Sequence, residues 1–244
     1  MILRRAAGVL LHPTSLPGQF GIGDFGNELI AFLDWAQSAG LRLWQVLPLN
    51  PPGYGNSPYG CHSSYAGNPL LISPEHLVED GLLPEHALDD LPRFPQDRVD
   101  FDAVMEFKNR LLRESWQRSR NHYEYAQRRF QEDNAWLEEW ATYAALKDRY
   151  AGAKWTEWPH AIAIRDPAAM ATAKRELAEE IRYHKYIQFL FFRQWAAIRE
   201  AAAAREIHIM GDVPIYVAGD SADVWANREL FQLDENGEPT VVAG

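Results

Sequence analysis

Short apolar runs alternate with a segment of helical periodicity in the first fifty residues of the chain. Residues 8–11 (Gly-Val-Leu-Leu) stop at a polar segment, which is typical of a buried strand that ends in a loop. Apolar residues then recur at helical spacing between Asp24, the expected N-cap, and Gly40, the expected left-handed C-terminal cap. A second apolar run follows at residues 43–47. The pattern predicts two parallel strands joined through a helix by a right-handed connection.

Residues 73–205 change character and consist almost entirely of amphipathic segments with charged faces. Apolar residues at helical spacing predict one helix around residues 104–111, another around 137–144 and a third around 187–198. The residue before Pro159 is disfavoured in a helix, so the tryptophan-rich stretch there is expected to be irregular. We interpret this part of the chain as a large helical insertion.

A third apolar run at residues 207–211 predicts a third strand, and the residues from Asp234 onward are expected to form a turn and loop. Three parallel strands joined by helices indicate an α/β fold. A complete eight-stranded barrel takes about 250 residues without insertions, so we expect a partial (β/α)8 (TIM-type) barrel with its first three or so strands. The expected parts are residues 1–72 with strands one and two and a substrate loop, residues 73–205 with the helical insertion and the helices that pack on the barrel, and residues 206–244 with strand three and the loop after it.

The charge balance and the cysteine content narrow the partners and the compartment. The sequence has 24 Lys and Arg against 34 Asp and Glu, a net charge of -10, which disfavours nucleic acids and anionic membranes as partners. No window approaches the roughly 20 apolar residues that span a bilayer, and the apolar run near the N-terminus is too short for a signal peptide. The single cysteine, Cys61, cannot form an internal disulfide. We therefore expect a soluble protein of the cytoplasm.

Several common chemistries lack their motifs in this sequence. The histidines show no metal-ligand spacing, and neither a Gly-x-Ser-x-Gly elbow nor a Walker phosphate loop occurs, so we expect no metal and no cofactor. Asp220 and Asp223 are interpreted as parts of a helix-capping arrangement, with Asp220 or Ser221 as the N-cap. The acidic clusters at residues 132–134 and 138–139 are interpreted as a solvated face of the insertion.

The loop after the second predicted strand, residues 51–60, has the most informative composition. Its glycines and prolines fix an unusual backbone path, while Tyr54, Tyr59 and the nearby Tyr65 carry flat, amphipathic rings. Such rings suit a glucosyl unit, which is apolar on its faces and hydroxylated at its rim, and Ser57 offers a hydrogen bond. The alternative is that these tyrosines only pack the loop onto the rim of the barrel.

Polar residues also follow the first and third predicted strands. His12, Thr14 and Ser15 come after the first strand, and Asp212 comes directly after the third. Loops after the carboxyl ends of the strands form the active face of barrels of this type. Asp212 is therefore either a polar group of that face or a cap.

Read together, several segments closely resemble the 4-α-glucanotransferases, also called amylomaltases or disproportionating enzymes. The resemblance rests on Pro-Thr-Ser-Leu-Pro-Gly at 13–18, Phe-Gly-Ile-Gly-Asp-Phe-Gly at 20–26, Trp-Gln-Val-Leu-Pro-Leu at 44–49 and Gly-Tyr-Gly-Asn-Ser-Pro-Tyr at 53–59. It continues at 65–69, at 184–195 and from Gly211 onward. The resemblance is looser in the helical middle of the chain.

The resemblance implies a retaining double displacement that transfers α-1,4-glucan segments between maltooligosaccharides. This chemistry needs a nucleophilic carboxylate and an acid/base carboxyl group about 5 Å apart. The family carries them in Arg-x-Asp-His and Ala-Glu-Asp-Leu types of motif, with a third aspartate in a Thr-His-Asp-Asn type. None of these motifs occurs in the 244 residues. We therefore expect the N-terminal portion of such an enzyme, without a catalytic residue, inactive alone and in need of the remainder of the barrel.

The resemblance also implies roles for four residues. Tyr59 matches the tyrosine that packs against the sugar near the scissile bond, and Tyr54 matches one associated with an additional glucan contact. Ser57 is expected to donate a hydrogen bond to the substrate. Asp212 corresponds to an aspartate that supports the catalytic end of the barrel and is not the nucleophile. The expected ligands are maltooligosaccharides and α-1,4-glucans.

Two other hypotheses assign the chain a different kind of function. In the first, the chain is a non-catalytic glucan-binding remnant that kept Tyr54 and Tyr59. In the second, it is a helical interaction protein in which residues 73–205 are the functional part. The second hypothesis leaves the motifs at the strand ends unexplained.

Overall fold

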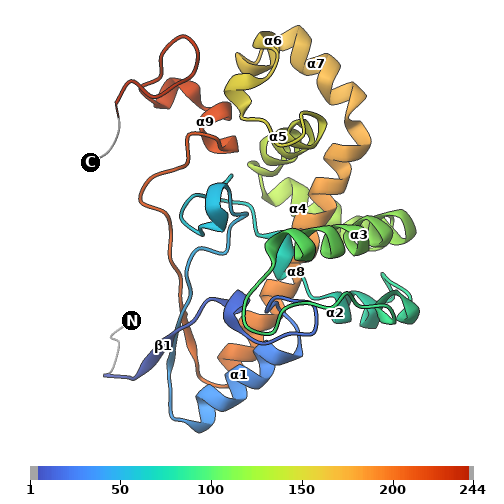
Figure 1. The fold of residues 1–244 in the computed structure, drawn as a ribbon, viewed down its shortest axis with the longest axis vertical. Helices are drawn as coiled ribbons and strands as arrows, with labels where there is room; N and C mark the ends of the chain where they lie inside the picture. Colours follow the sequence, from blue (N-terminus) through green and yellow to red (C-terminus); the bar gives the residue numbers. More distant parts are fainter. Residues whose placement is uncertain (1–4, 242–244) are drawn as a thin grey trace. The chain divides into compact units, whose positions relative to one another are not determined.

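The computed structural model describes residues 5–241 and divides into two compact units (Figure 1). The first, here called the sheet unit, comprises the described residues up to 49 together with residues 67–124 and 187–213. The second, the helical unit, comprises residues 50–66, 125–186 and the described residues from 214. Each unit is described separately below.

The elements follow the order expected from the hydrophobic pattern. The sheet unit contains β1 (Gly8–Leu10), α1 (Asn27–Ser38), β2 (Leu43–Gln45), α2 (Pro74–Glu79), α3 (Phe101–Ser119), β3 (His208–Met210) and the later turns of α8 (Ala178–Ala204). The helical unit contains α4 (Glu124–Asp133), α5 (Leu137–Arg149), α6 (His160–Ala163), α7 (Pro167–Glu176), the first turns of α8 and α9 (Ala222–Ala226). Short 3-10 helices lie at Pro13–Ser15, Tyr54–Asn56, Pro69–Leu71, Glu85–Leu88, Trp155–Glu157 and Arg228–Leu230.

The three strands form one parallel sheet in the order β1-β2-β3. Leu43 of β2 pairs with Gly8 of β1 on one side and with His208 of β3 on the other. Trp44 in the middle of β2 is fully buried, and its indole N–H donates to the carbonyl oxygen of Leu11 at 2.8 Å. The strand predictions and the α/β architecture are therefore confirmed.

One of the two cap predictions for α1 is correct and the other is wrong. Gly40 ends the helix with a φ of 75°, the left-handed conformation expected of a C-terminal glycine. The N-cap is Gly26, however, and not Asp24. Asp24 Oδ1 accepts a hydrogen bond from the Gly26 amide, while Oδ2 lies 2.6 Å from Nζ of Lys108, which is buried with it. A buried ammonium group needs a counter-charge, and Asp24 supplies it.

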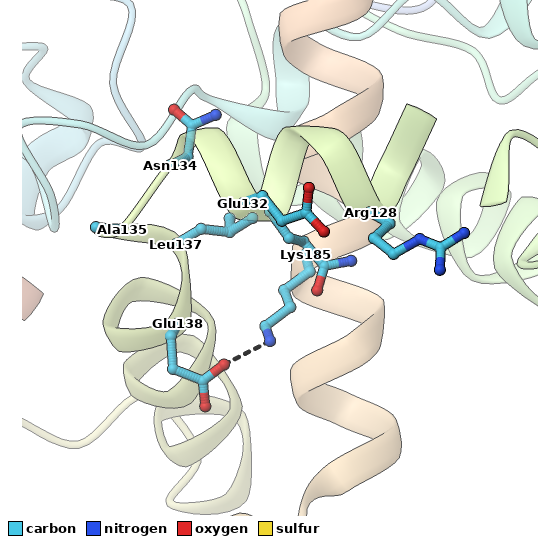
Figure 2. Close-up of a pocket in the computed structure, with 8 residues that line it drawn as sticks. Arg128, Glu132, Asn134, Ala135, Leu137, Glu138 and Lys185 are labelled. Atoms are coloured by element: carbon cyan, nitrogen blue, oxygen red, sulfur yellow. Dashed lines mark ion pairs between the residues drawn. The ribbon is translucent and has the colours of Figure 1, made fainter. Parts of the chain in front are cut away.

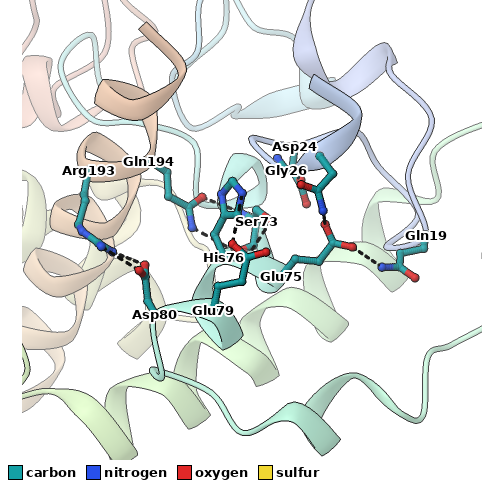
Figure 3. A network of polar contacts seen from close by, with 11 residues as sticks. Gln19, Asp24, Gly26, Ser73, Glu75, His76, Glu79, Asp80, Arg193 and Gln194 are labelled. Atoms are coloured by element: carbon teal, nitrogen blue, oxygen red, sulfur yellow. Dashed lines mark hydrogen bonds and ion pairs between the residues drawn. The ribbon is translucent and has the colours of Figure 1, made fainter. Parts of the chain in front are cut away.

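Two buried glutamines of α8, the long orange helix in Figure 1, bind backbone far away in the sequence. The side-chain amide of Gln194 accepts from the Ser73 amide at 2.7 Å and donates to the Ser73 carbonyl at 3.2 Å. Gln188 does the same with Gly67, at 2.7 Å and 3.0 Å. Figure 3 shows the Gln194 contact beside the ion pair of Arg193 with Asp80. These contacts satisfy buried backbone groups next to α2.

The helices predicted within residues 73–205 are present as α3, α5 and α8. The positions expected to be apolar and inward are buried in α3 and α5, among them Val104 and Trp140. Trp158, before Pro159, is extended with a ψ of 164°. No helix in the described part of the chain is long and apolar enough to cross a membrane.

The two compact units are a different division of the chain from the three parts expected from the sequence, which stay a prediction. Each unit takes residues from all three of the ranges 1–72, 73–205 and 206–244. The reason lies in residues 50–66, which follow β2 but hydrogen-bond to residues 220–223 in the helical unit.

Candidate functional site

The loop expected to contact sugar is closed at its base by backbone hydrogen bonds. The Gly53 amide donates to the Gly60 carbonyl at 2.8 Å, and the chain between them turns through left-handed conformations at Gly55 (φ 68°) and Asn56 (φ 54°). Glycine and asparagine tolerate this region of backbone space best. The sequence Gly-Tyr-Gly-Asn at 53–56 therefore fixes a tight turn.

The turn presents Tyr59 and Ser57 together. The Tyr59 side chain is 46% exposed, and the Tyr59 amide donates to Ser57 Oγ at 3.3 Å. The hydroxyl of Ser57 thus shapes the turn and keeps an O–H that can donate elsewhere. The side chain of Tyr54 lies outside the part of the chain that the structure describes.

Residues 62–64, which follow the loop, are hydrogen-bonded to the first residues of α9 and to Asp220 before it. The Ser64 amide donates to Asp223 Oδ2 at 2.8 Å, and the Ala222 amide donates to the His62 carbonyl at 2.8 Å. His62 Nδ1 lies 2.9 Å from the Asp220 carbonyl oxygen. These three hydrogen bonds join two stretches that lie far apart in the sequence. They hold the loop in one position within the helical unit.

The capping arrangement expected at residues 220–223 is confirmed for Ser221 and wrong for the two carboxylates. Ser221 Oγ accepts from the Val224 amide at 3.2 Å and caps α9. Asp223 instead accepts from Ser64, and burial raises the pKa of its carboxyl group. The cap needs one acceptor, and Ser221 already supplies it.

Asp220 is a hydrogen-bond acceptor for three groups of the helical unit. Oδ1 accepts from the Tyr143 hydroxyl at 2.8 Å and from the Trp155 amide at 3.2 Å, and Oδ2 lies 2.7 Å from Lys147 Nζ. Burial and the neighbouring Asp220 carboxylate raise the pKa of Tyr143, so its hydroxyl remains a donor. These contacts assign Asp220 a structural role.

The carboxyl ends of β1 and β3 carry His12 and Asp212 in the sheet unit. His12 Nδ1 lies 2.6 Å from Thr14 Oγ1, and Nε2 lies 3.3 Å from the Pro48 carbonyl oxygen. Burial lowers the pKa of His12, which favours the neutral ring. Asp212 Oδ1 accepts from the Val213 amide at 2.9 Å. The ends of parallel strands share one edge of a sheet, so both residues lie at that edge.

A polar cavity of about 430 Å³ in the helical unit is lined by residues of α4, α5 and α8 (Figure 2). Lys185 Nζ lies 2.5 Å from Glu138 Oε2. Burial opposes ionisation of Glu138, but hydrogen bonds from Lys185 and Lys174 outweigh it and hold the pKa of Glu138 below its usual value. An acid paired in this way is not poised to protonate a substrate.

The interpretation of residues 132–134 and 138–139 as a solvated face is only partly correct. Glu132 and Asp133 are exposed. Glu138 and Glu139 are half-buried, and Glu139 Oε2 lies 2.7 Å from Arg165 Nη2. Among residues 5–241, no group of three or more His, Cys, Asp or Glu side chains is arranged to hold a metal ion.

Comparison with known proteins identifies relatives along nearly the whole chain. A family model described as 4-alpha-glucanotransferase matches residues 11–243. The 4-alpha-glucanotransferase of Synechocystis sp. is 45% identical over 250 residues, with 100% of this chain aligned to 50% of that protein. The enzyme of Thermus thermophilus is 47% identical, with 100% of this chain aligned to 49% of it. The 4-alpha-glucanotransferase of Solanum tuberosum, named chloroplastic/amyloplastic, is 43% identical, with 99% aligned to 43%.

Solved structures give the same result for the fold. An amylomaltase from Streptococcus agalactiae in complex with acarbose has a TM-score of 0.94 and 35% identity, over 99% of this chain and 50% of that chain. The fold is therefore that of part of an amylomaltase barrel, as expected from the sequence. The chain spans about half the length of the curated relatives it matches. Because the family model covers nearly every residue, the chain belongs to the 4-alpha-glucanotransferase family.

Proposed function

We propose that this chain supplies glucan-binding loops to a 4-alpha-glucanotransferase, which transfers α-1,4-glucan segments between maltooligosaccharides by a retaining double displacement. The observation that carries the proposal is the family match over residues 11–243. The amylomaltase structure in complex with acarbose supports a glucan-like substrate.

Tyr59 is proposed as the aromatic platform for a glucosyl unit. Its exposed ring sits on a turn whose base is closed by hydrogen bonds, so the ring is positioned before a sugar arrives. Ser57 next to it is proposed to donate a hydrogen bond to a sugar hydroxyl, and Tyr54 to make an additional glucan contact. Asp212 is proposed to support the catalytic end of the barrel.

The 244 residues are proposed not to catalyse the transfer alone. Double displacement needs two opposed carboxyl groups about 5 Å apart, and none of the three family motifs that carry such groups occurs in the sequence. Within the helical unit, Asp220 is engaged by Tyr143 and Lys147, and Asp223 by the Ser64 amide. These carboxylates therefore serve the loop and not a reaction.

The remainder of a barrel is the proposed partner of the sheet unit. Leu10 on β1 and Met210 on β3 are large apolar side chains that are exposed, and Val213 after β3 is 75% exposed. Among the described strands, β1 and β3 each pair on one side only. Unpaired strands with exposed apolar residues favour the addition of further strands.

Reconstitution tests this proposal. The purified chain is assayed for maltotriose disproportionation alone and after coexpression with the half of the Thermus thermophilus relative that it does not align to. We expect products only from the coexpressed pair, and Tyr59→Ala to reduce them strongly while Tyr125→Ala, an exposed tyrosine of α4, leaves them unchanged. Activity of the chain alone contradicts the proposed inactivity. Maltotriose binding by the folded 244-residue chain, without turnover by the coexpressed pair, favours the glucan-binding remnant.

The cytoplasmic location inferred from the single cysteine stays a prediction. The Solanum tuberosum relative is named chloroplastic/amyloplastic, so members of this family occupy more than one compartment.

A further inference from the structure

A second cavity in the helical unit, of about 410 Å³, is lined by three aromatic rings. We call it the Trp136 cavity. Tyr65 comes from the loop, Trp136 and Trp140 come from the start of α5, and Asp223 comes from α9. Its volume falls within the range of about 300–1,000 Å³ that is usual for small-molecule sites.

One wall of the Trp136 cavity is a stacked pair of aromatic rings. The rings of Tyr65 and Trp136 lie 6.2 Å apart between centroids, with an angle of 17° between their planes. Tyr65 is nevertheless 60% exposed, so this ring does not fill a core. A flat ring held by stacking and open to solvent offers an apolar face to the face of a sugar.

Arg165 occupies a backbone position that favours glycine. It follows Ile164, the C-cap of α6, with a φ of 61°, the left-handed conformation that glycine adopts most easily after a helix. What arginine adds at this position is its side chain. The guanidinium group lies 4.2 Å from the centre of the Trp225 ring, and Nη2 pairs with Glu139 at 2.7 Å.

Two N–H donors of cavity-lining residues have no hydrogen-bond acceptor within the described part of the chain. They are Nη1 of Arg165 and Nε1 of Trp140, both buried. Buried donors are almost always paired in folded proteins, so two at one cavity call for an explanation. Both atoms are enclosed, so a hydroxyl group in the cavity becomes their acceptor only when the side chains that cover them move.

The charges of the cavity favour a neutral ligand. Arg165 carries one positive charge, while Glu139 and Asp223 carry carboxyl groups, and Asn227 adds an amide. A phosphate or a carboxylate would face two carboxyl groups and only one positive charge. A sugar offers hydroxyl groups, which both donate to carboxylates and accept from N–H groups.

We propose that the Trp136 cavity is a second saccharide-binding site, separate from the turn that carries Tyr59, and that it takes a short segment of an α-1,4-glucan. The identity of the sugar rests on the proposed function, whereas the cavity and its donors do not. Such a site holds a glucan at a second point along its length, which raises the effective concentration of the chain end at the turn.

Maltotriose titration tests the site through the indole N–H signals of the ¹⁵N-labelled chain. We expect the Trp140 signal, assigned with Trp140→Phe, to shift saturably with maltotriose. Tyr65→Ala and Arg165→Gly should each weaken this binding by about tenfold. Tyr125→Ala is the matched control, because Tyr125 is also an exposed tyrosine but does not line the cavity.

Several outcomes overturn the proposal. The site is absent if the Trp140 signal does not move at saturating maltotriose, or if Tyr65→Ala and Arg165→Gly bind as the parent chain does. An equal shift with inorganic phosphate indicates an anion site instead. Tyr59→Ala separates this proposal from the previous one. We expect it to reduce transfer by the coexpressed pair strongly and to leave the maltotriose-induced shift of Trp140 in place.

Discussion

The two units of this chain use their buried polar groups in different ways. In the sheet unit, Lys108 is fully enclosed and has three acceptors, namely Asp24 and the carbonyl oxygens of Leu70 and Ile72. In the helical unit, the buried Nε1 of Trp140 and Nη1 of Arg165 have no acceptor among the described residues. Satisfied groups stabilise a fold, whereas unsatisfied groups at a cavity reduce stability and favour a ligand. The sheet unit therefore encloses a fully paired buried charge, whereas the helical unit has unpaired buried donors on residues that line a cavity.

Breaking the buried ion pair should have the largest effect. Asp24→Ala leaves the Lys108 ammonium without a counter-charge, and we expect the free energy of unfolding to fall by about 3–5 kcal/mol. Urea denaturation followed by circular dichroism measures it. Asp97→Ala, in the exposed pair with Arg98, serves as control and should change stability by less than about 1 kcal/mol. A small effect of Asp24→Ala would mean that Lys108, whose pKa is already lowered by burial, loses its proton or that water reaches it.

Removing Asp220 should have the next largest effect. Asp220→Ala leaves the buried Tyr143 hydroxyl and the Trp155 amide without their acceptor, so we expect a loss of about 2–3 kcal/mol in urea denaturation. Tyr143→Phe removes one partner without leaving an unpaired group at Tyr143 and should cost less. If both variants lose the same stability, the contact with Tyr143 accounts for the whole effect. The other contacts of Asp220 then add nothing to stability.

Arg165→Gly should change stability little, in contrast to both variants above. Glycine suits the left-handed backbone at this position, and the change removes a buried unpaired N–H, while the ion pair with Glu139 is lost. We expect a difference within about 1 kcal/mol by urea denaturation. A loss above about 2 kcal/mol would make Arg165 a structural residue and would remove one support for the Trp136 cavity.

The smallest expected effect is a dependence on pH. Burial lowers the pKa of His12 in the folded state, while the unfolded value is about 6.5. The contribution of neutral His12 to stability is therefore full above about pH 6.5 and is lost as the pH falls through the folded-state pKa. His12→Gln should lose less stability than the parent chain between about pH 7.5 and pH 5. Equal losses in the two proteins would assign the pH dependence to other groups.

Local patterns in the sequence predicted the elements, while distant contacts decided the roles of the polar residues. The strands, the helices and the left-handed Gly40 follow from neighbours a few positions apart. Asp24 was misassigned because its partner Lys108 lies 84 residues away. Asp220 and Asp223 were misassigned for the same reason, since Tyr143 lies 77 residues from the first and Ser64 159 from the second.

The same contrast between local patterns and distant contacts applies to the candidate sites. The composition of residues 51–60 was enough to single out Tyr59 and Ser57, which the structure places on one turn. The Trp136 cavity has no local signature, because its walls come from four separate stretches of the chain. The sequence marks Tyr65 as an amphipathic ring near the loop, but nothing in it indicates that Tyr65 stacks on Trp136.

The narrow neck of the loop, where Gly53 meets Gly60, limits how this family member can be re-engineered. A methyl group on Gly53 would lie 2.5 Å from the Gly60 carbonyl oxygen, closer than atoms in proteins approach. Any larger residue at position 53 would push the two strands of the loop apart and break the hydrogen bond that closes the turn. Substitutions that test the proposed sugar contact should therefore be placed between the two glycines and leave Gly53 unchanged.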